Sequence, residues 1–283
     1  MSDNIFIFYH SGCSDGSLGG AIADIFFSKY SDYKYAIYPL YYGEKIKVDC
    51  NNKTLIFIDI IPCNKNNDLK KISEEATEFI VLDHHEPNFK TLDGINISKR
   101  SQLDNNRSGC MIAWDFFFGE IEPPEVVKYI QEGDLYRFEL PGSREFVRAF
   151  NSSIPPTIQE RVKHIDDPID EYVKEGKVLL KYDKINFNNF MKYDCKDMAY
   201  GNDKGCIINL HRMFASNFSD YVLKLRKDIG FVICWSMSKS GNYKYSLRSK
   251  EGVDVSLIAN DFGGGGHRQA SGFSSDKSPN ELF

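Results

Sequence analysis

Three side chains that can bind metal ions follow an apolar run in the first third of the chain. Asp83, His84 and His85 come directly after the run from Phe79 to Leu82. Carboxylate and imidazole groups are common ligands of divalent ions such as Mn²⁺, Zn²⁺ and Fe²⁺. Two adjacent histidines at the end of a strand have no evident packing role, so the triplet predicts a metal site at that end.

Other potential ligands lie near the ends of other expected elements. They are His10, Cys13, Asp15, Asp59 and Asp134. His10 follows an apolar run of strand length, and Asp59 ends another. In a parallel sheet the carboxyl ends of the strands meet at one edge, where ligands bind. We therefore expect these side chains to surround two ions about 3.5–4 Å apart, with the carboxylate of Asp59 between them.

Each of these candidates also has an explanation that needs no metal. Asp15 could cap the helix that follows it, a position where Asp is favoured. Asp59 and Asp134 could be turn residues, and His10 could be a loop histidine. These alternatives stay open at each single position. The agreement among four separate segments is what favours the metal site.

Apolar runs of strand length alternate with helical patterns along the first part of the chain. The expected strands are 5–9, 35–42, 54–61 and 78–82, and helical patterns cover 21–27, 69–76, 108–118 and 124–133. Strands that are apolar throughout, with helices between them, are typical of a parallel sheet covered on both faces. We predict an α/β protein with an N-terminal doubly wound, mostly parallel sheet. The helical pattern over 158–193 is expected to connect it to a second domain.

The remaining sequence predicts a smaller α/β domain with a mixed sheet. Strand patterns cover 206–210, 231–237 and 243–248, and helical patterns cover 219–226 and 253–262. The short turn at 240–242 makes the last two strands a hairpin. We place the domain boundary near residue 190, which gives domains 1–190 and 191–283.

Four consecutive glycines, residues 263–266, precede His267 and Arg268. Glycine allows backbone conformations in which successive N–H groups converge on an anion. His267 could donate to a phosphate, and Arg248, at the end of an expected strand, could make a fork-shaped phosphate contact. A flexible linker is the alternative, but a small, apolar strand pattern follows the glycines. We predict substrate-binding residues here: Arg248, Gly264, Gly265, Gly266, His267 and Arg268.

The composition excludes several classes of protein. The formal net charge of −5 argues against a broad basic face for long duplex nucleic acid. No apolar stretch reaches the ~18–20 residues of a membrane span. The seven cysteines are scattered without metal-ligand spacing, and no secretory segment is evident, so we expect free thiols in a reducing cytoplasm and no structural zinc site.

Taken together, these motifs resemble the DHH phosphoesterase superfamily, in the branch that carries a DHH-associated C-terminal domain with a Gly-Gly-Gly-His loop. The specific parts are Asp83-His84-His85 and the segment 263–267, and the resemblance runs from Ile5 to Phe273. Relatives in this branch include nanoRNases, phosphatases of 3′-phosphoadenosine 5′-phosphate, single-strand exonucleases and cyclic-dinucleotide phosphodiesterases. Family II pyrophosphatases and exopolyphosphatases share only the first domain.

The resemblance also implies roles for individual residues. It implies one ion held by His10, Cys13 and Asp59, and a second held by Asp15, Asp59, His84 and Asp134. Mn²⁺ is the expected metal, with Zn²⁺, Fe²⁺ or Mg²⁺ as options. His85 would contact the substrate phosphate or assist the leaving group, and Asp83 would orient the imidazoles. Asp59, Asp83 and His85 are thus the predicted catalytic residues, and the glycine segment with Arg248 and His267 would hold the substrate.

One position departs from the family pattern, because most of the superfamily has Asp where this chain has Cys13. A thiolate favours softer ions such as Zn²⁺ or Fe²⁺ over Mn²⁺. Cys13 could be a ligand, the first site could be weak, or only one ion could bind tightly. A merely buried thiol is an equal alternative.

The expected function is hydrolysis of a phosphodiester or terminal phosphate bond in a short oligonucleotide or small nucleotide, by a cytoplasmic metal-dependent enzyme. The alternatives are a pyrophosphatase or exopolyphosphatase, and a degenerate, non-catalytic nucleotide-binding protein. The Gly-rich His segment speaks against the first alternative, and only Cys13 favours the second. We expect neither membrane nor long duplex nucleic acid as partners. The resemblance leaves a homodimer open.

Overall fold

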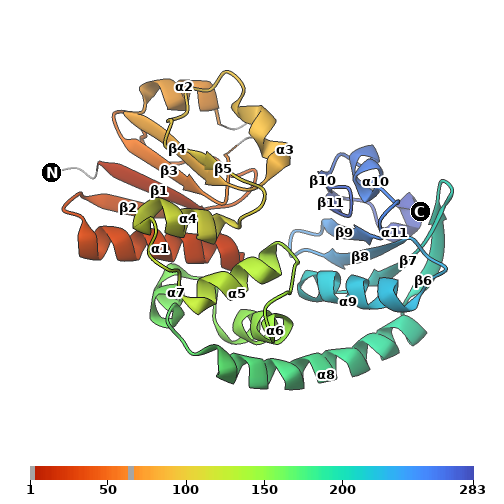
Figure 1. Ribbon diagram of the computed structural model, residues 1–283. Helices are drawn as coiled ribbons and strands as arrows, with labels where there is room; N and C mark the ends of the chain where they lie inside the picture. The colour runs from red at the N-terminus through yellow and green to blue at the C-terminus, as the bar shows by residue number, and fades with distance from the viewer. Residues whose placement is uncertain (1–3, 63–66) are drawn as a thin grey trace. The chain divides into compact units, whose positions relative to one another are not determined.

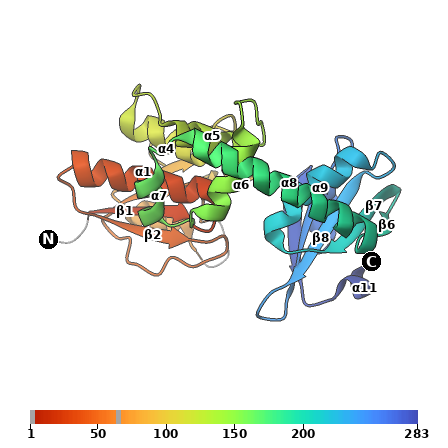
Figure 2. The same cartoon turned by 90° about the horizontal axis from the view of Figure 1, so that it is seen from below.

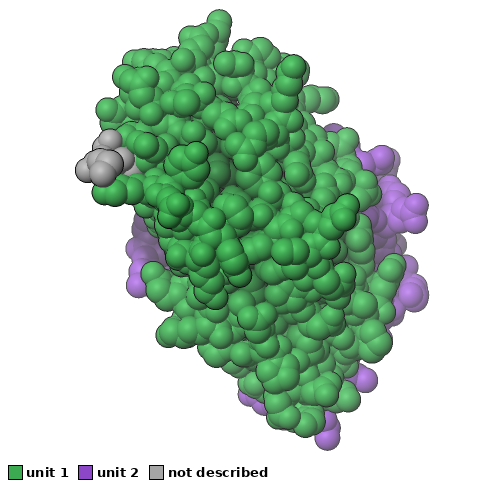
Figure 3. Space-filling model, turned by 60° about the vertical axis from the view of Figure 1, so that its left-hand side comes forward, with its two compact units in different colours: residues 1–180 green, residues 181–283 purple. Residues whose placement is uncertain are grey.

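The computed structural model describes residues 4–62 and 67–283, which divide between two compact units (Figure 3). Unit 1 covers residues 1–180 and unit 2 covers residues 181–283. The division falls inside helix α8 (Ile169–Tyr193), so this helix contributes to both units. We predicted a boundary near residue 190, further along the same helix, because its continuous polar pattern has no break at residue 180.

Within the residues that the structure describes, unit 1 contains a five-stranded sheet of order β2-β1-β3-β4-β5 (Figure 1). The strands are β1 (Ile5–His10), β2 (Tyr35–Leu40), β3 (Thr54–Ile58), β4 (Glu78–Asp83) and β5 (Gln102–Leu103). All neighbouring strands run parallel, as predicted. Ile58 pairs with Tyr9 on one side and with Leu82 on the other. This register brings the carboxyl ends of β1, β3 and β4 together.

Both faces of this sheet are covered. Successive side chains of a strand point to opposite faces, so the apolar residues of each strand pack in two separate cores. Ile7, Ile56 and Ile80 belong to a core formed with the helices α1 (Ser14–Tyr30), α4 (Gly109–Phe118), α5 (Glu125–Asp134) and α6 (Ser143–Ser153). The rings of Phe8, Phe57 and Phe79 form a row on the other face, with centroids 5.0 and 4.8 Å apart. That row packs in a core with α2 (Leu69–Glu75). The predicted doubly wound α/β architecture is confirmed.

Unit 2 forms a second sheet, and its described residues contribute six strands in the order β10-β11-β9-β8-β7-β6 (Figure 1). Figure 2 shows β6, β7 and β8 of this sheet from below. The strands are β6 (Lys196–Tyr200), β7 (Asp203–Asn209), β8 (Phe231–Met237), β9 (Tyr243–Ser249), β10 (Gly265–His267) and β11 (Ala270–Ser275). β7 and β8 run parallel and the other pairs are antiparallel, so the sheet is mixed, as predicted. The helices of this unit are the end of α8, α9 (Arg212–Leu225), α10 (Val255–Asp261) and α11 (Pro279–Leu282).

The structure differs from the expected elements in several places. The helical pattern over 158–193 is broken into α7 (Ile158–His164) and α8, because Pro168 disfavours helical backbone at the residue before it. The segments of α6 and β6 were not predicted as helix and strand. Residues 265–267 were predicted as a loop but form β10, which pairs with β11. No helix in the ranges 4–62 and 67–283 has both the length and the apolarity needed to cross a membrane.

Candidate metal centre

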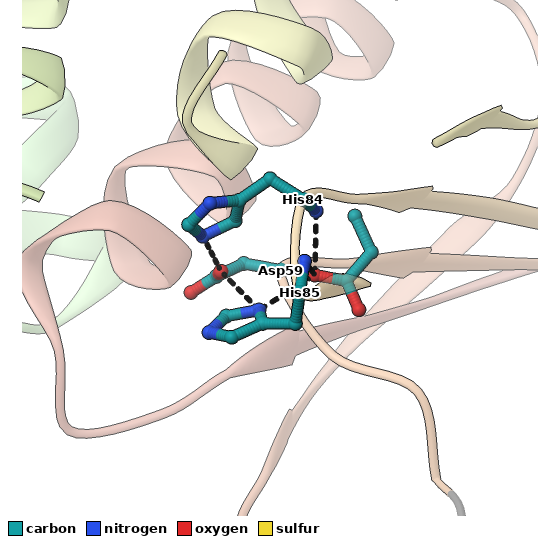
Figure 4. Close-up of side chains that lie close together, drawn as sticks. Asp59, His84 and His85 are labelled. Atoms are coloured by element: carbon teal, nitrogen blue, oxygen red, sulfur yellow. Dashed lines mark hydrogen bonds and ion pairs between the residues drawn. The ribbon is translucent and has the colours of Figure 1, made fainter. Parts of the chain in front are cut away.

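The carboxyl ends of three central strands gather the predicted ligands of unit 1. His10 is the last residue of β1, Asp59 follows β3, and Asp83 is the last residue of β4. The imidazoles of His84 and His85 point toward the carboxylate of Asp59 (Figure 4). The Oδ1 atom of Asp59 lies 3.2 Å from His84 Nε2 and 3.6 Å from His85 Nδ1.

One group of potential ligand atoms consists of His10, Cys13 and Asp59. The sulfur of Cys13 lies 3.2 Å from His10 Nδ1 and 3.2 Å from Asp59 Oδ2. His10 Nδ1 is in turn 3.2 Å from the same carboxylate oxygen. Three ligand-type atoms therefore form a tight triangle, and the thiol of Cys13 faces the group.

A second group consists of Asp15, His84 and Asp134. His84 Nε2 lies 3.3 Å from Asp134 Oδ2 and 3.9 Å from Asp15 Oδ2. The same nitrogen lies 3.2 Å from Asp59 Oδ1. The two oxygens of Asp59 thus divide between the groups, with Oδ2 beside the first and Oδ1 beside the second. This division is the geometry that a carboxylate between two ions needs.

The backbone at Asp59 adopts a conformation that L-residues avoid. Its φ is +59°, in the left-handed region, where Asp and Asn are better tolerated than most residues. Its N–H still donates to Leu82 O at 2.8 Å, so the turn begins directly where the strand pairing ends. Gly109 lies so close that a Cβ there would be 2.5 Å from Asp59 Cβ. The turn therefore presents the carboxylate toward the start of α4.

The first turn of α4 holds the carboxylate of Asp15. Gly109 N–H donates to Asp15 Oδ2 at 2.6 Å, and Cys110 N–H donates to Asp15 Oδ1 at 3.0 Å. A helix N-terminus offers such free N–H groups and favours negative charge. Sequence reasoning missed both donors, although Ser108 before an apolar run is a helix-start signal. Asp15 is not the cap of α1; that position belongs to Cys13, whose sulfur accepts from Gly16 N–H at 3.2 Å.

Asp83 is fully buried and orients the two histidines. Its Oδ1 atom accepts hydrogen bonds from the backbone N–H of His84 at 2.8 Å and from that of His85 at 3.3 Å. The same oxygen lies 2.8 Å from His85 Nδ1. Because Nδ1 of His85 is occupied in this way, its Nε2 atom is the one left to meet a substrate.

The electrostatics of the cluster fit a cation. Burial, together with the charges of nearby carboxylates, raises the pKa of Asp134 well above its usual value and also raises that of Asp15. Burial alone would lower the pKa of His84, but Asp59, Asp134 and Asp15 together raise it to about 9. Among the described residues, the buried atoms His84 Nε2 and Asp59 Oδ1 have no properly aligned hydrogen-bond partner. Divalent ions would satisfy these atoms and offset the carboxylate charges.

The chemistry of Cys13 is set by the same surroundings. Burial raises the pKa of the thiol well above its usual value, and the negative charges of Asp59 and Asp15 raise it further. Without a cation, the thiol therefore stays protonated and donates to Asp59 Oδ2. A metal ligand must be the thiolate, so Cys13 would ligate only with an ion strong enough to displace its proton.

In unit 2 the structure aligns two of the predicted substrate-binding residues in one row. Arg248 on β9 pairs with Ala270 on β11, and Ala270 pairs with His267 on β10. Directly paired residues share a face of the sheet, so the two side chains share a face on either side of a small alanine. The guanidinium of Arg248 also donates to Ser216 Oγ at 2.9 Å.

The other predicted substrate-binding residues, Arg268 and the three glycines, differ in exposure and packing. The side chain of Arg268 is 79% exposed and its Nε lies 3.2 Å from Asp254 Oδ2, so the structure does not group it with Arg248. Gly265 and Gly266 belong to β10. Gly264 packs so tightly that a Cβ there would meet Gly272 O at 2.3 Å. A Cβ on Gly266 would likewise meet Ala270 O at 2.6 Å, so Gly264 and Gly266 are required for close strand packing, whereas Gly265 has room for a Cβ.

Comparison with known proteins gives one family match and one close relative. The DHHA1 domain family matches residues 206–282, within unit 2. An uncharacterized protein of Acanthamoeba polyphaga mimivirus, R106, is 30% identical over 286 residues, which is 94% of this chain and 66% of that protein. The chain therefore spans slightly less than two thirds of the length of this relative.

Two solved structures are similar. An exopolyphosphatase-related protein from Bacteroides fragilis has a TM-score of 0.55 at 14% identity, covering 99% of this chain and 89% of that chain. A pGpG-specific phosphodiesterase, PggH, from Vibrio cholerae has a TM-score of 0.49 at 16% identity, covering 96% and 92%. The first of these likenesses shows a shared fold. The chain thus has an Asp-His-His motif at the end of β4 and a match to the DHHA1 domain family within unit 2, the two features that support its resemblance to the DHH superfamily.

Proposed function

We propose that this chain is a divalent-metal-dependent hydrolase that cleaves a phosphodiester or terminal phosphate bond in a short oligonucleotide or a small nucleotide. The observation that carries the proposal is the division of the Asp59 carboxylate between two ligand groups, each within 3.2 Å of one of its oxygens. A pair of ions, when bound, would offset the charge of a phosphoryl group and ease the loss of a proton from water. We propose Mn²⁺ as the native metal, with Zn²⁺ or Fe²⁺ favoured if Cys13 ligates.

His85 is proposed to act on the substrate itself. Its side chain is 26% exposed, and Asp83 holds its Nδ1 at 2.8 Å. Burial would lower the pKa of His85, but Asp83 and Asp59 outweigh this and raise it above its usual value. A ring that carries a proton on Nε2 could donate it to a phosphate oxygen or to the leaving oxygen, and the raised pKa favours that protonated form.

Unit 2 is proposed to bind a phosphate of the substrate. Arg248 and His267 stand in one row of the sheet with only Ala270 between them. A guanidinium and an imidazole that share a face suit a doubly or singly charged phosphate group. The N–H groups of Gly265 and Gly266 would add donors where strand pairing leaves them available, whereas Gly264 N–H already donates to Ala259 O at 2.8 Å.

A second candidate is a pyrophosphatase or exopolyphosphatase. The B. fragilis protein with the shared fold is named as exopolyphosphatase-related, which supports this candidate. Such an enzyme acts on an inorganic phosphate chain, so it needs no group that recognises a nucleoside. A non-catalytic nucleotide-binding protein is the third candidate, and Cys13 in place of the usual aspartate is its only support.

The experiment is a hydrolysis panel with Mn²⁺-loaded protein. The substrates are a 5′-phosphorylated RNA dinucleotide, 3′-phosphoadenosine 5′-phosphate, a cyclic dinucleotide, pyrophosphate and tripolyphosphate. We expect turnover of at least one nucleotide substrate, lost on chelation and lost in His84→Asn. His164→Asn is the matched control, because His164 pairs with Asp167 on a distant helix turn. Turnover of the inorganic substrates alone would favour the second candidate, and no turnover at all would leave only the third.

A further inference from the structure

Two exposed tyrosines follow β2, and none of the roles above uses them. Tyr41 and Tyr42 are 55% and 48% exposed. The ring of Tyr41 lies beside Gly12, where an added Cβ would be 3.3 Å from Tyr41 Cε1. The ring of Tyr42 meets the His10 ring at a centroid distance of 4.7 Å and an interplanar angle of 65°. It meets the His85 ring at 6.0 Å and 79°. An aromatic side chain thus touches one member of the ligand cluster and the histidine proposed to face the substrate.

The loop that carries these rings is held in one conformation. Glu44 N–H donates to Tyr41 O at 3.0 Å, which closes a β-turn. Gly43 has a φ of +82°, as the third residue of a type II turn requires. The Glu44 carboxylate accepts from Tyr41 N–H at 3.4 Å and pairs with Lys47 at 2.9 Å. The backbone that carries the rings is therefore held by the turn, and the Tyr42 ring is also held by its contact with His10, which reduces the entropy cost of using it in binding.

The two tyrosine rings differ in chemistry from the side chains of the metal centre. The cluster beside them is made of carboxylates, imidazoles and a thiol, so it recognises metal ions and phosphate charge. A tyrosine adds no charge there, but it offers an apolar π-face. Every nucleobase has a π-face and stacks on aromatic side chains, whereas an inorganic phosphate chain has none.

We propose that Tyr41 and Tyr42 form a stacking platform for a nucleobase next to the phosphorus centre, so that the site selects nucleotides over inorganic pyrophosphate and polyphosphate. This inference rests on the proposed function and narrows its substrate class. The competing explanation is that Tyr42 only packs against His10 and keeps that imidazole in place.

A matched pair of ligands separates these explanations. Adenosine 5′-monophosphate and ribose 5-phosphate carry the same sugar phosphate, and only the first has a base. Binding of each to the Mn²⁺-loaded protein is measured by calorimetry for the wild type, Tyr41→Leu, Tyr42→Leu, Tyr42→Phe and the control Tyr33→Leu. Tyr33 is 67% exposed and precedes β2 at its other end. Leucine keeps apolar bulk against His10 but removes the π-face.

The platform predicts tighter binding of the adenosine ligand than of ribose 5-phosphate by the wild type. Tyr42→Leu should weaken the adenosine ligand about 5- to 150-fold, the range typical of one lost base stack. It should leave ribose 5-phosphate unchanged, and Tyr42→Phe and Tyr33→Leu should match the wild type. Equal binding of both ligands by the wild type, or an equal loss of both in Tyr42→Leu, would overturn the platform.

The second measurement is of KM and kcat. It distinguishes a failure of the stacking platform from a failure of the proposed function. For an RNA dinucleotide, Tyr42→Leu should raise KM with little change in kcat, because stacking holds the substrate without touching the reacting atoms. If the wild type hydrolyses no phosphoester, the proposed function fails, while the binding comparison still decides whether the platform exists. If the wild type hydrolyses nucleotides and Tyr42→Leu keeps the wild-type KM, only the platform fails.

Discussion

Asp59→Asn tests the central feature of the site, because it removes the charge of the one carboxylate that both ligand groups share. The change keeps the side-chain shape, and Asn tolerates the left-handed backbone at this position as well as Asp does. The backbone hydrogen bond to Leu82 O is unaffected. The expected losses therefore come from the negative charge and from the one acceptor oxygen that becomes an amide NH₂.

The size of the effect can be worked out for folding and for catalysis separately. Loss of the charge-assisted hydrogen bond between Asp59 Oδ2 and His10 Nδ1, at 3.2 Å, costs about 1.5–3 kcal/mol, offset in part by less repulsion with Asp15 and Asp134. For a chain of this size that is a fall in Tm of less than about 10 °C. Both ions lose a ligand, so several kcal/mol of transition-state stabilisation disappear, which is about 10³-fold or more in kcat.

Metal content and turnover are the measurements. After loading and dialysis, we expect two ions per chain in the wild type and fewer than one in Asp59→Asn. His10→Asn and Asp134→Asn should each keep one ion, because each belongs to a single ligand group. Asp32→Asn, an exposed carboxylate of the same unit, is the control. An Asp59→Asn protein that keeps two ions and turns over within tenfold of the wild type would refute the shared role.

Three further outcomes are expected. Cys13→Asp should keep or raise Mn²⁺-supported activity and weaken Zn²⁺ binding, since oxygen ligands suit Mn²⁺ and Asp also caps α1; a large loss of activity would mean that the sulfur has a role of its own. Gly109→Ala should lower the free energy of unfolding by about 1–3 kcal/mol and lower kcat about 100-fold or more. The reason is that the alanine Cβ would lie 2.5 Å from Asp59 Cβ and 2.8 Å from Asp15 Oδ2. Thermal unfolding and turnover measure the two effects. In chelator at pH 7, Asp134→Asn should raise Tm, because burial and neighbouring charges raise the pKa of this carboxyl and its ionised form is unfavourable in the fold. That gain should shrink as the pH falls toward the ordinary pKa of 3.8 and vanish well below it, where the carboxyl is protonated in both states; a gain that persists there would contradict this cause.

The sequence alone determined the fold class and the composition of the site. Apolar runs such as 55–58 and 79–82, alternating with helical patterns, are typical of a covered parallel sheet, and ligands in such sheets lie at the carboxyl ends of the strands. Both facts are local, so the placement of His10, Asp59 and Asp83 at strand ends could be predicted from residue types and spacing.

Only the tertiary structure decided how these residues meet. The register of β1, β3 and β4 turns one oxygen of Asp59 toward each ligand group, and the start of α4 supplies the N–H groups that hold Asp15. The placement of Tyr42 against His10 likewise depends on β2 lying beside β1. These contacts join segments far apart in the chain, so no local pattern encodes them; they follow from packing the whole sheet at once.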